Sequence, residues 1–156
     1  MHIKILAIGK IREKYLQEAQ KEYEKRLSRF CTLEIIELQA EEILDESLSE
    51  KYKKLEGERI LKHIKDNSFI ITLEIKGKSF SSEALAQEIK SISAQGHNEI
   101  LFIIGGANGL DIEVSKRADL KLSFSQMTFT HQLMRIILLE QIYRCFKINA
   151  NESYHR

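Results

Sequence analysis

Residues Ile100 to Ile104 form an uninterrupted apolar run that leads directly into the turn Gly105-Gly106-Ala107-Asn108-Gly109. An apolar run without alternation is typical of a strand that is covered on both faces, as in a parallel sheet. Parallel strands need long crossover connections, which are usually helices. The run therefore predicts an α/β fold with a mostly parallel sheet flanked by helices.

The rest of the chain alternates between β-branched runs and segments with helical periodicity, as this fold requires. Further strands are predicted over residues 2–8, 32–38, 69–75 and 121–124. Helices are predicted over residues 13–28, from about 55 to 65 with Gly57 as a weak point, from Ser81 or Ser82 to Gly96, over 111–118 and over 131–148. Residues 40–50 are expected to form an acidic, exposed loop. No repeat or linker interrupts residues 1–156, so we expect a single domain.

The composition excludes several classes of protein. The chain contains no proline and no apolar run near the 18 or so residues that a membrane span needs, and its first residues do not resemble a signal peptide. We therefore expect a cytoplasmic protein that does not cross a membrane. The net charge is +1, with basic ends and an acidic middle, so nucleic acid could bind only through a local patch.

The two cysteines, Cys31 and Cys145, lie far apart in the sequence. Neither has a second cysteine or a histidine at metal-ligand spacing, so no disulfide framework and no metal site are expected. Both are interpreted as buried, reduced thiols.

Ligands of α/β sheets usually bind beyond the carboxyl ends of the strands. Three loops are predicted there, at residues 73–78, 105–109 and 124–130. The glycine spacing GGxxG of the second loop fits neither GxGxxG nor the phosphate-binding GxxxxGK[ST] pattern. Two interpretations stay open for this loop: a tight turn that needs glycine at positive φ, or a strand end that lets a flat ligand approach the backbone.

The last predicted helix is apolar over most of its circumference, apart from a polar stripe of Glu140, Arg144 and Lys147. A helix of this kind must be buried on more than one side. We expect a homodimer built on this helix; the alternative is a central core helix within one subunit.

Two further groups of residues are candidates for a site. His131 and Arg135 share one face at the start of the last helix, where a phosphate or carboxylate would be favoured, or His131 is merely a polar first-turn residue. Tyr154, His155 and Arg156 could stack on a base, move a proton and neutralise charge, but terminal residues are commonly disordered.

The order of these motifs resembles the RlmH family of bacterial large-subunit ribosomal RNA (pseudouridine N3)-methyltransferases, which belong to the SPOUT class. The resemblance covers essentially the whole chain. It depends on Gly9-Lys10, on residues 103–109, on the run Met127-Thr128-Phe129-Thr130-His131-Gln132, on Arg135, on residues 140–144 and on the final Tyr154-His155-Arg156.

The resemblance implies a SPOUT fold with a C-terminal trefoil knot, a homodimer, and S-adenosylmethionine as the methyl donor. It implies a cofactor site made of Leu73, Gly105, Phe124, Ser125, Gln126, Met127, Thr128 and Phe129. These residues belong to the three loops that the sheet geometry selects independently.

The resemblance further implies that the substrate is 23S ribosomal RNA within the assembled ribosome. As hypotheses, His155 is the base that removes the N3 proton of a pseudouridine, and Arg156 stabilises charge. Tyr154 orients the base or orders the tail, and Arg144 supports the target or the tail across the dimer. His131 and Arg135 are assigned to RNA phosphate binding or loop support. The alternatives are a non-catalytic dimeric RNA- or ribosome-binding module and a SPOUT methyltransferase acting on transfer RNA.

The chain departs from the family pattern at two places. Thr130 stands where a proline is common, and it could cap the last helix instead. Asn151-Glu152-Ser153 replaces the glycine and proline often found before the final Tyr-His-Arg, and asparagine tolerates the left-handed geometry that a bend there would need.

Overall fold

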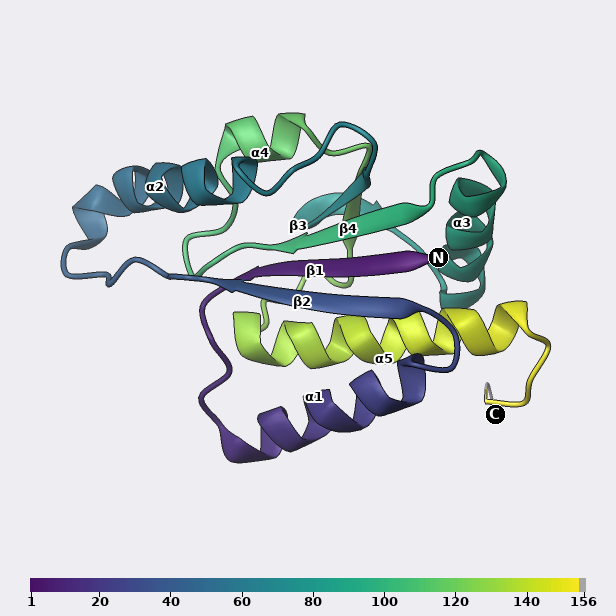
Figure 1. Cartoon of the computed structure of the whole chain (residues 1–156). Coiled ribbons are helices and arrows are strands. Elements are labelled where there is room, and N and C mark those ends of the chain that lie inside the picture. Colours follow the sequence, from purple (N-terminus) through teal and green to yellow (C-terminus); the bar gives the residue numbers. More distant parts are fainter. Residues whose placement is uncertain (155–156) are drawn as a thin grey trace.

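The protein is a five-stranded parallel sheet with helices on both faces (Figure 1). The computed structural model describes residues 1–154. The strands are β1 (His2–Ile8), β2 (Thr32–Leu38), β3 (Phe69–Ser79), β4 (Glu99–Ile104) and β5 (Leu120–Ser123), in the spatial order β2-β1-β4-β3-β5. The helices are α1 (Lys14–Leu27), α2 (Ser49–Leu61), α3 (Ser82–Ala94), α4 (Ile112–Lys116) and α5 (His131–Asn149). The predicted α/β class is confirmed.

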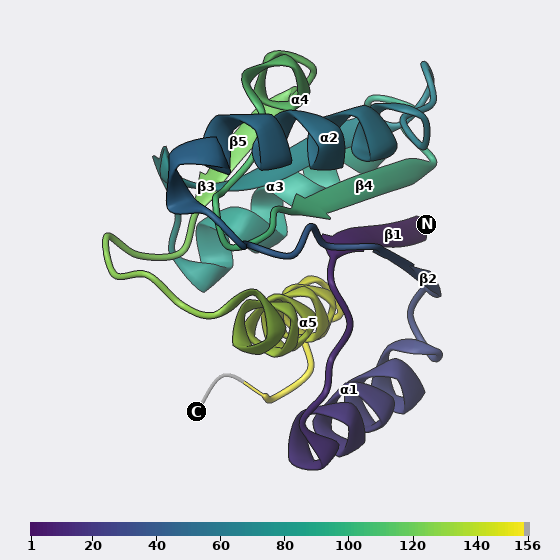
Figure 2. The ribbon, with the colours of Figure 1, turned by 90° about the vertical axis from the view of Figure 1, so that its left-hand side faces the viewer.

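Alternate residues of the central strands supply two separate cores. Ile3, Ile5 and Ala7 of β1 pack toward α1, α3 and α5, whereas Leu6 and Ile8 pack toward α2 and α4. Figure 2 shows α5 and α1 on one side of the sheet and α2 and α4 on the other. The apolar run of β4 is buried along almost its whole length, as a strand with two covered faces must be.

Helix α5 lies under the sheet, against both α1 and α3 (Figure 1). Its inner face, which includes Leu138, Leu139 and Ile142, is completely buried within one subunit. This burial corresponds to the alternative of a central core helix within one subunit. The described residues do not test the homodimer, which stays a prediction.

The predicted starts of α3 and α5 agree with the observed caps, but α2 begins at Ser49, not near residue 55, and a 3-10 turn at Glu46–Leu48 precedes it within the predicted loop. Ser81 accepts a hydrogen bond from the N–H of Ala84, and Thr130 accepts one from the N–H of Leu133. Gly96 has φ +94°, as expected of a residue that ends a helix. Gly57, predicted as a weak point, stands where α2 meets α4: a Cβ there would lie 2.5 Å from the Cβ of Asp111.

Strand β3 is longer than predicted. We expected it to end at Ile75 before a turn, but it continues to Ser79 after a register shift against β5 between Leu73 and Lys78. A Cβ on Gly77 would lie 2.7 Å from the backbone carbonyl carbon of Lys121, so glycine allows the two strands to approach again. At this shift the pairing between β3 and β5 is interrupted, next to the predicted cofactor residues 124–129 that follow β5.

Three further features bear on the predictions. No helix among residues 1–154 is long and apolar enough to cross a membrane, and the same residues contain no cluster of His, Cys, Asp and Glu that could hold a metal ion. Both thiols are free; burial raises the pKa of Cys145 to about 12 and that of the half-buried Cys31 to about 11. The trefoil knot follows from the resemblance and stays a prediction, because strand order and pairing do not test it.

We expect Leu138→Ala to reduce the free energy of unfolding by about 2–5 kcal/mol, because the side chain is fully buried between α5 and the sheet. Urea denaturation measures this change. Leu44→Ala is the matched control: that leucine is 80% exposed, and its truncation should change stability by less than about 0.5 kcal/mol. Equal effects of the two substitutions would contradict the described core.

Candidate functional site

A cavity of about 730 Å³ lies at the carboxyl ends of β4 and β5, beside the register shift in the middle of β3. Its walls come from the three loops that the sequence predicts as ligand-binding: residues 73–75, 104–110 and 122–132 contribute, with Met134 beyond them. The lining includes seven of the eight predicted cofactor residues: Leu73, Gly105, Phe124, Ser125, Met127, Thr128 and Phe129. Gln126 is the exception; it is exposed and outside the lining.

The glycine turn is shaped by close approach more than by positive φ. Of its three glycines only Gly109 has positive φ, at +82°. A Cβ on Gly105 would lie 2.8 Å from the carbonyl group of Gly109, and a Cβ on Gly106 would lie 2.6 Å from an oxygen of the buried Glu56. Glycine is thus required at these two positions by contacts within the protein, and the choice between the two interpretations of the loop stays open.

The loop before α5 is held to the opened part of β3. The Ser123 hydroxyl donates to the carbonyl oxygen of Ile75 at 2.9 Å, and the N–H of Met127 donates to the Ser125 hydroxyl at 3.0 Å. Met127 is nevertheless 73% exposed and Phe129 is 40% exposed. The loop thus offers apolar side chains at the mouth of the cavity.

Glu74 is a site residue that sequence reasoning missed. It lines the cavity, and its carboxylate accepts hydrogen bonds from the hydroxyl groups of Thr72 at 2.7 Å and Ser115 at 2.9 Å. No ion pair involves Glu74 among residues 1–154. Its position after Leu73 is the signal that was available, but one carboxylate at a strand end is too common to select. A carboxylate held by hydroxyl groups and without a cation suits a positively charged ligand.

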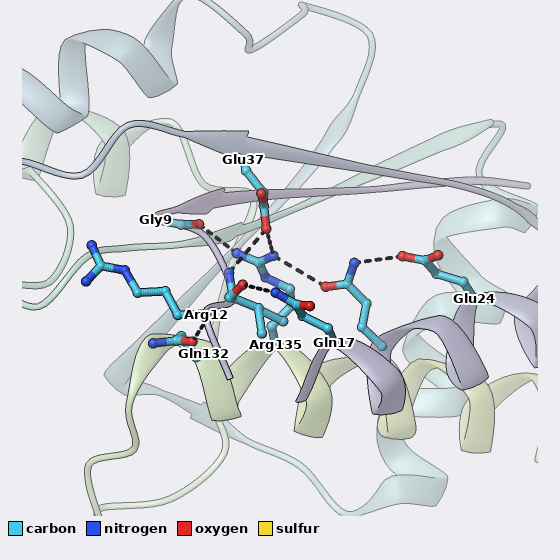
Figure 3. A network of polar contacts seen from close by, with 9 residues as sticks. Gly9, Arg12, Gln17, Glu24, Glu37, Gln132 and Arg135 are labelled. Carbon is cyan, nitrogen blue, oxygen red and sulfur yellow. Dashed lines mark hydrogen bonds and ion pairs between the residues drawn. The ribbon is translucent and has the colours of Figure 1, made fainter. Parts of the chain in front are cut away.

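Arg135 is completely buried, which corrects one half of its assignment. Its guanidinium donates to the carboxylate of Glu37, to the carbonyl oxygen of Gly9 at 2.8 Å and to the side chain of Gln20 at 3.3 Å (Figure 3). With its donors turned inward, Arg135 cannot contact an RNA phosphate at the surface. Its contacts fit the other half of the prediction, loop support.

His131 lines the cavity and is half-buried against Gly9. A Cβ on Gly9 would lie 2.9 Å from Nε2 of His131, and Gly9 itself has φ +86°. Burial lowers the pKa of His131 below its ordinary value, and the charges of Arg135 and Arg12 lower it further. Both effects favour the neutral form of the His131 side chain.

The tail is attached to the other end of α5. The Arg144 guanidinium lies 4.9 Å from the centre of the Tyr154 ring, which also packs edge-on against Tyr143. Arg144 in turn donates two hydrogen bonds to Glu140, at 2.6 and 2.9 Å. Arg144 thus contacts Tyr154 within one chain, whereas its predicted support of the target or the tail across the dimer stays a prediction. His155 and Arg156 lie outside the described residues.

Neither departure from the family pattern disturbs the backbone. Thr130 has φ −61°, the value that a proline would impose, and its hydroxyl caps α5. Asn151 has φ +55°, the left-handed geometry that glycine usually supplies, and its N–H donates to the carbonyl oxygen of Ile148.

Tyr154 and the cavity of the same chain lie far apart. Tyr143, which holds Tyr154, is twelve residues after His131, and a helix rises about 1.5 Å per residue, so the two levels are about 18 Å apart along the axis of α5. Tyr154 is therefore anchored near the end of α5 that lies away from the cavity of its own subunit.

Comparisons with known proteins identify close relatives over the full length. A family model described as "Predicted SPOUT methyltransferase" matches residues 1–155. The chain is 56% identical to the putative ribosomal RNA large subunit methyltransferase H of Methanococcus maripaludis, and 52% identical to the ribosomal RNA large subunit methyltransferases H of Bifidobacterium adolescentis and Clostridium novyi. Each of these alignments covers 100% of both chains.

The lowered pKa of His131 predicts a pH-dependent contribution to stability. The unfolded chain takes up a proton near pH 6.5, above the pKa of the folded protein, so the contribution is complete above pH 6.5 and is lost as the pH falls from there toward the folded pKa. We expect the wild type to lose more stability than His131→Gln between about pH 7.5 and 5. Urea denaturation at several pH values measures the difference, and parallel profiles for the two proteins would rule it out.

Proposed function

Because the chain belongs to the SPOUT methyltransferase family, we propose that it transfers a methyl group from S-adenosylmethionine to N3 of a pseudouridine in 23S ribosomal RNA of the assembled ribosome. The observation that carries this proposal is the single cavity formed by all three predicted loops, with backbone at one wall and Glu74 in its lining. The relatives' name, ribosomal RNA large subunit methyltransferase H, supports ribosomal RNA as the substrate class. An enzyme of this kind would work in the cytoplasm, the location that the sequence predicts.

The residues of the cavity fit this methyl donor. The backbone of the Gly105 turn and the apolar side chains of Leu73 and Phe124 suit a flat base and a thioether chain, and the Glu74 carboxylate suits a positive charge. Bound there, S-adenosylmethionine would supply a methyl group on a positively charged sulfur. A neutral His131 adds no competing positive charge at the mouth of the cavity.

The protein has to align two reactants and remove one proton. Positioning alone contributes about 7–11 kcal/mol to such reactions, whereas a general base typically adds about 10²–10⁴-fold. We assign proton removal from N3 to His155 and charge stabilisation on the base to Arg156. Tyr154, held over Arg144, orients the tail for these roles.

The distance between tail and cavity supports a homodimer in which one subunit's tail serves the other subunit's cavity. The outer face of α5 and the preceding loop leave apolar side chains for such contact: Met127, Phe129 and Leu133 are each at least 40% exposed. A two-fold contact along this face would place opposite ends of the two α5 helices together.

We expect Gly105→Val to abolish measurable binding of S-adenosylmethionine, because a side chain there would meet the backbone of Gly109 and force the turn that lines the cavity to shift. Isothermal titration calorimetry of the wild type tests the donor, and the variant tests its place. Ala84→Val on the exposed side of α3 is the control and should bind normally. Wild-type protein without affinity for the donor would favour the non-catalytic binding module, and normal binding by Gly105→Val would show that the pocket is misplaced.

We expect removal of Tyr154 to Arg156 to eliminate methylation of ribosomes while leaving binding of S-adenosylmethionine intact, because the tail acts on the substrate.

Mixing two inactive variants tests whether the cavity of one subunit is completed by the tail of the other. Heterodimers of truncated subunits with Gly105→Val subunits should recover activity, since one complete pair of cavity and tail forms between them. Unchanged turnover after truncation would refute the tail assignment, and methylation of transfer RNA in place of ribosomes would favour the other SPOUT alternative.

A further inference from the structure

We propose that Lys10 and Arg12 contact the phosphate backbone of the RNA substrate at the rim of the cavity. They belong to residues 10–14, here called the basic strap, which follow β1, include the first residue of α1 and also carry Lys14 and Glu13. The strap therefore has three cations and one carboxylate. This inference rests on the proposed function and names the surface through which the substrate is held.

The strap lies beside the cavity because it is attached to residues that line the cavity. The N–H of Arg12 donates to the side-chain oxygen of Gln132 at 2.7 Å, and Gly9, directly before the strap, packs against His131. Gln132 and His131 both belong to the cavity lining. A nucleotide that enters the cavity would bring its flanking phosphates close to the strap.

The backbone of the strap is fixed by the buried network in Figure 3. Arg135 donates to the carbonyl oxygen of Gly9, the N–H of Ile11 donates to Glu37 at 3.4 Å, and Gln17 donates to the carbonyl oxygen of Ile11 at 2.9 Å. Positions held in this way lose little backbone freedom when a partner binds. The network thus fixes the backbone at Lys10 and Arg12 before a partner binds.

The charges of the strap are not neutralised by the protein. Within the described residues no ion pair involves Lys10, Arg12 or Lys14, and all three residues are exposed. The neighbouring carboxylate of Glu37 is already paired with Arg135. Figure 3 shows the Arg12 side chain turned away from that network.

Guanidinium and ammonium groups at fixed positions are the usual partners of phosphate oxygens, and such contacts set the register of a nucleic acid. Arg135, which the sequence suggested for this role, is buried; Arg12 offers the same group at the surface of the same region. RNA is favoured over an acidic protein because the strap adjoins the cavity that a nucleotide would enter.

The test compares Lys10→Gln/Arg12→Gln with the control Lys62→Gln/Lys90→Gln, which removes the same charge from exposed lysines on other helices. Binding to ribosomes is measured over a series of KCl concentrations. We expect the strap variant to bind about tenfold more weakly at moderate salt and the slope of log K against log[KCl] to fall in magnitude by about 2, because each phosphate contact contributes about 1. The control should match the wild type.

Activity and donor binding separate this inference from the proposed function. The strap variant should bind S-adenosylmethionine normally and show a raised KM for ribosomes with kcat at saturation unchanged. Binding and slope equal to those of the control would overturn the inference, and so would weaker binding with an unchanged slope, which would indicate a protein contact. If the wild type binds ribosomes but transfers no methyl group, the proposed function fails, while the change in slope still tests the strap.

Discussion

The ion pair between the buried Arg135 and the partly buried Glu37 is the interaction on which the geometry of the site depends. Arg135 is completely buried, so its charge is tolerated only because the carboxylate and the Gly9 carbonyl oxygen accept its hydrogen bonds. These contacts join α5 to the ends of β1 and β2, three segments that are distant in the sequence. The first turn of α5, which borders the cavity, is fixed in place by this pair.

The strands and most helix boundaries could be predicted because they depend on local patterns. The apolar run of β4, the Ser81 and Thr130 caps and the left-handed Asn151 each follow from the properties of a few neighbouring residues. The extension of β3 could not be predicted in this way. It depends on Gly77 meeting the backbone of β5 more than forty residues later.

In the candidate site, too, features that depend on local patterns could be predicted, and features that depend on distant contacts could not. The loops after β4 and β5 were predictable because parallel strands end at one edge of the sheet, whereas the predicted loop at residues 73–78 is part of β3 and lines the cavity from within the strand. The role of Arg135 was not, because helical spacing places it on the same face as His131 without revealing that Glu37, 98 positions away, faces it from β2. Glu74 was missed for a related reason: its hydroxyl partner Ser115 comes from α4, on the far side of the glycine turn.

Helix α5 carries a cavity residue at its first position and the support of Tyr154 near its last turns. Each residue added to a helix advances it by about 1.5 Å and rotates it by about 100°. A one-residue insertion next to Leu139 would therefore rotate Tyr143, which packs against Tyr154, to another side of the helix. The cavity, which lies before the insertion, would remain intact. The length of α5 therefore fixes the position of Tyr154 relative to the cavity, and no change in a surface loop could compensate for such an insertion.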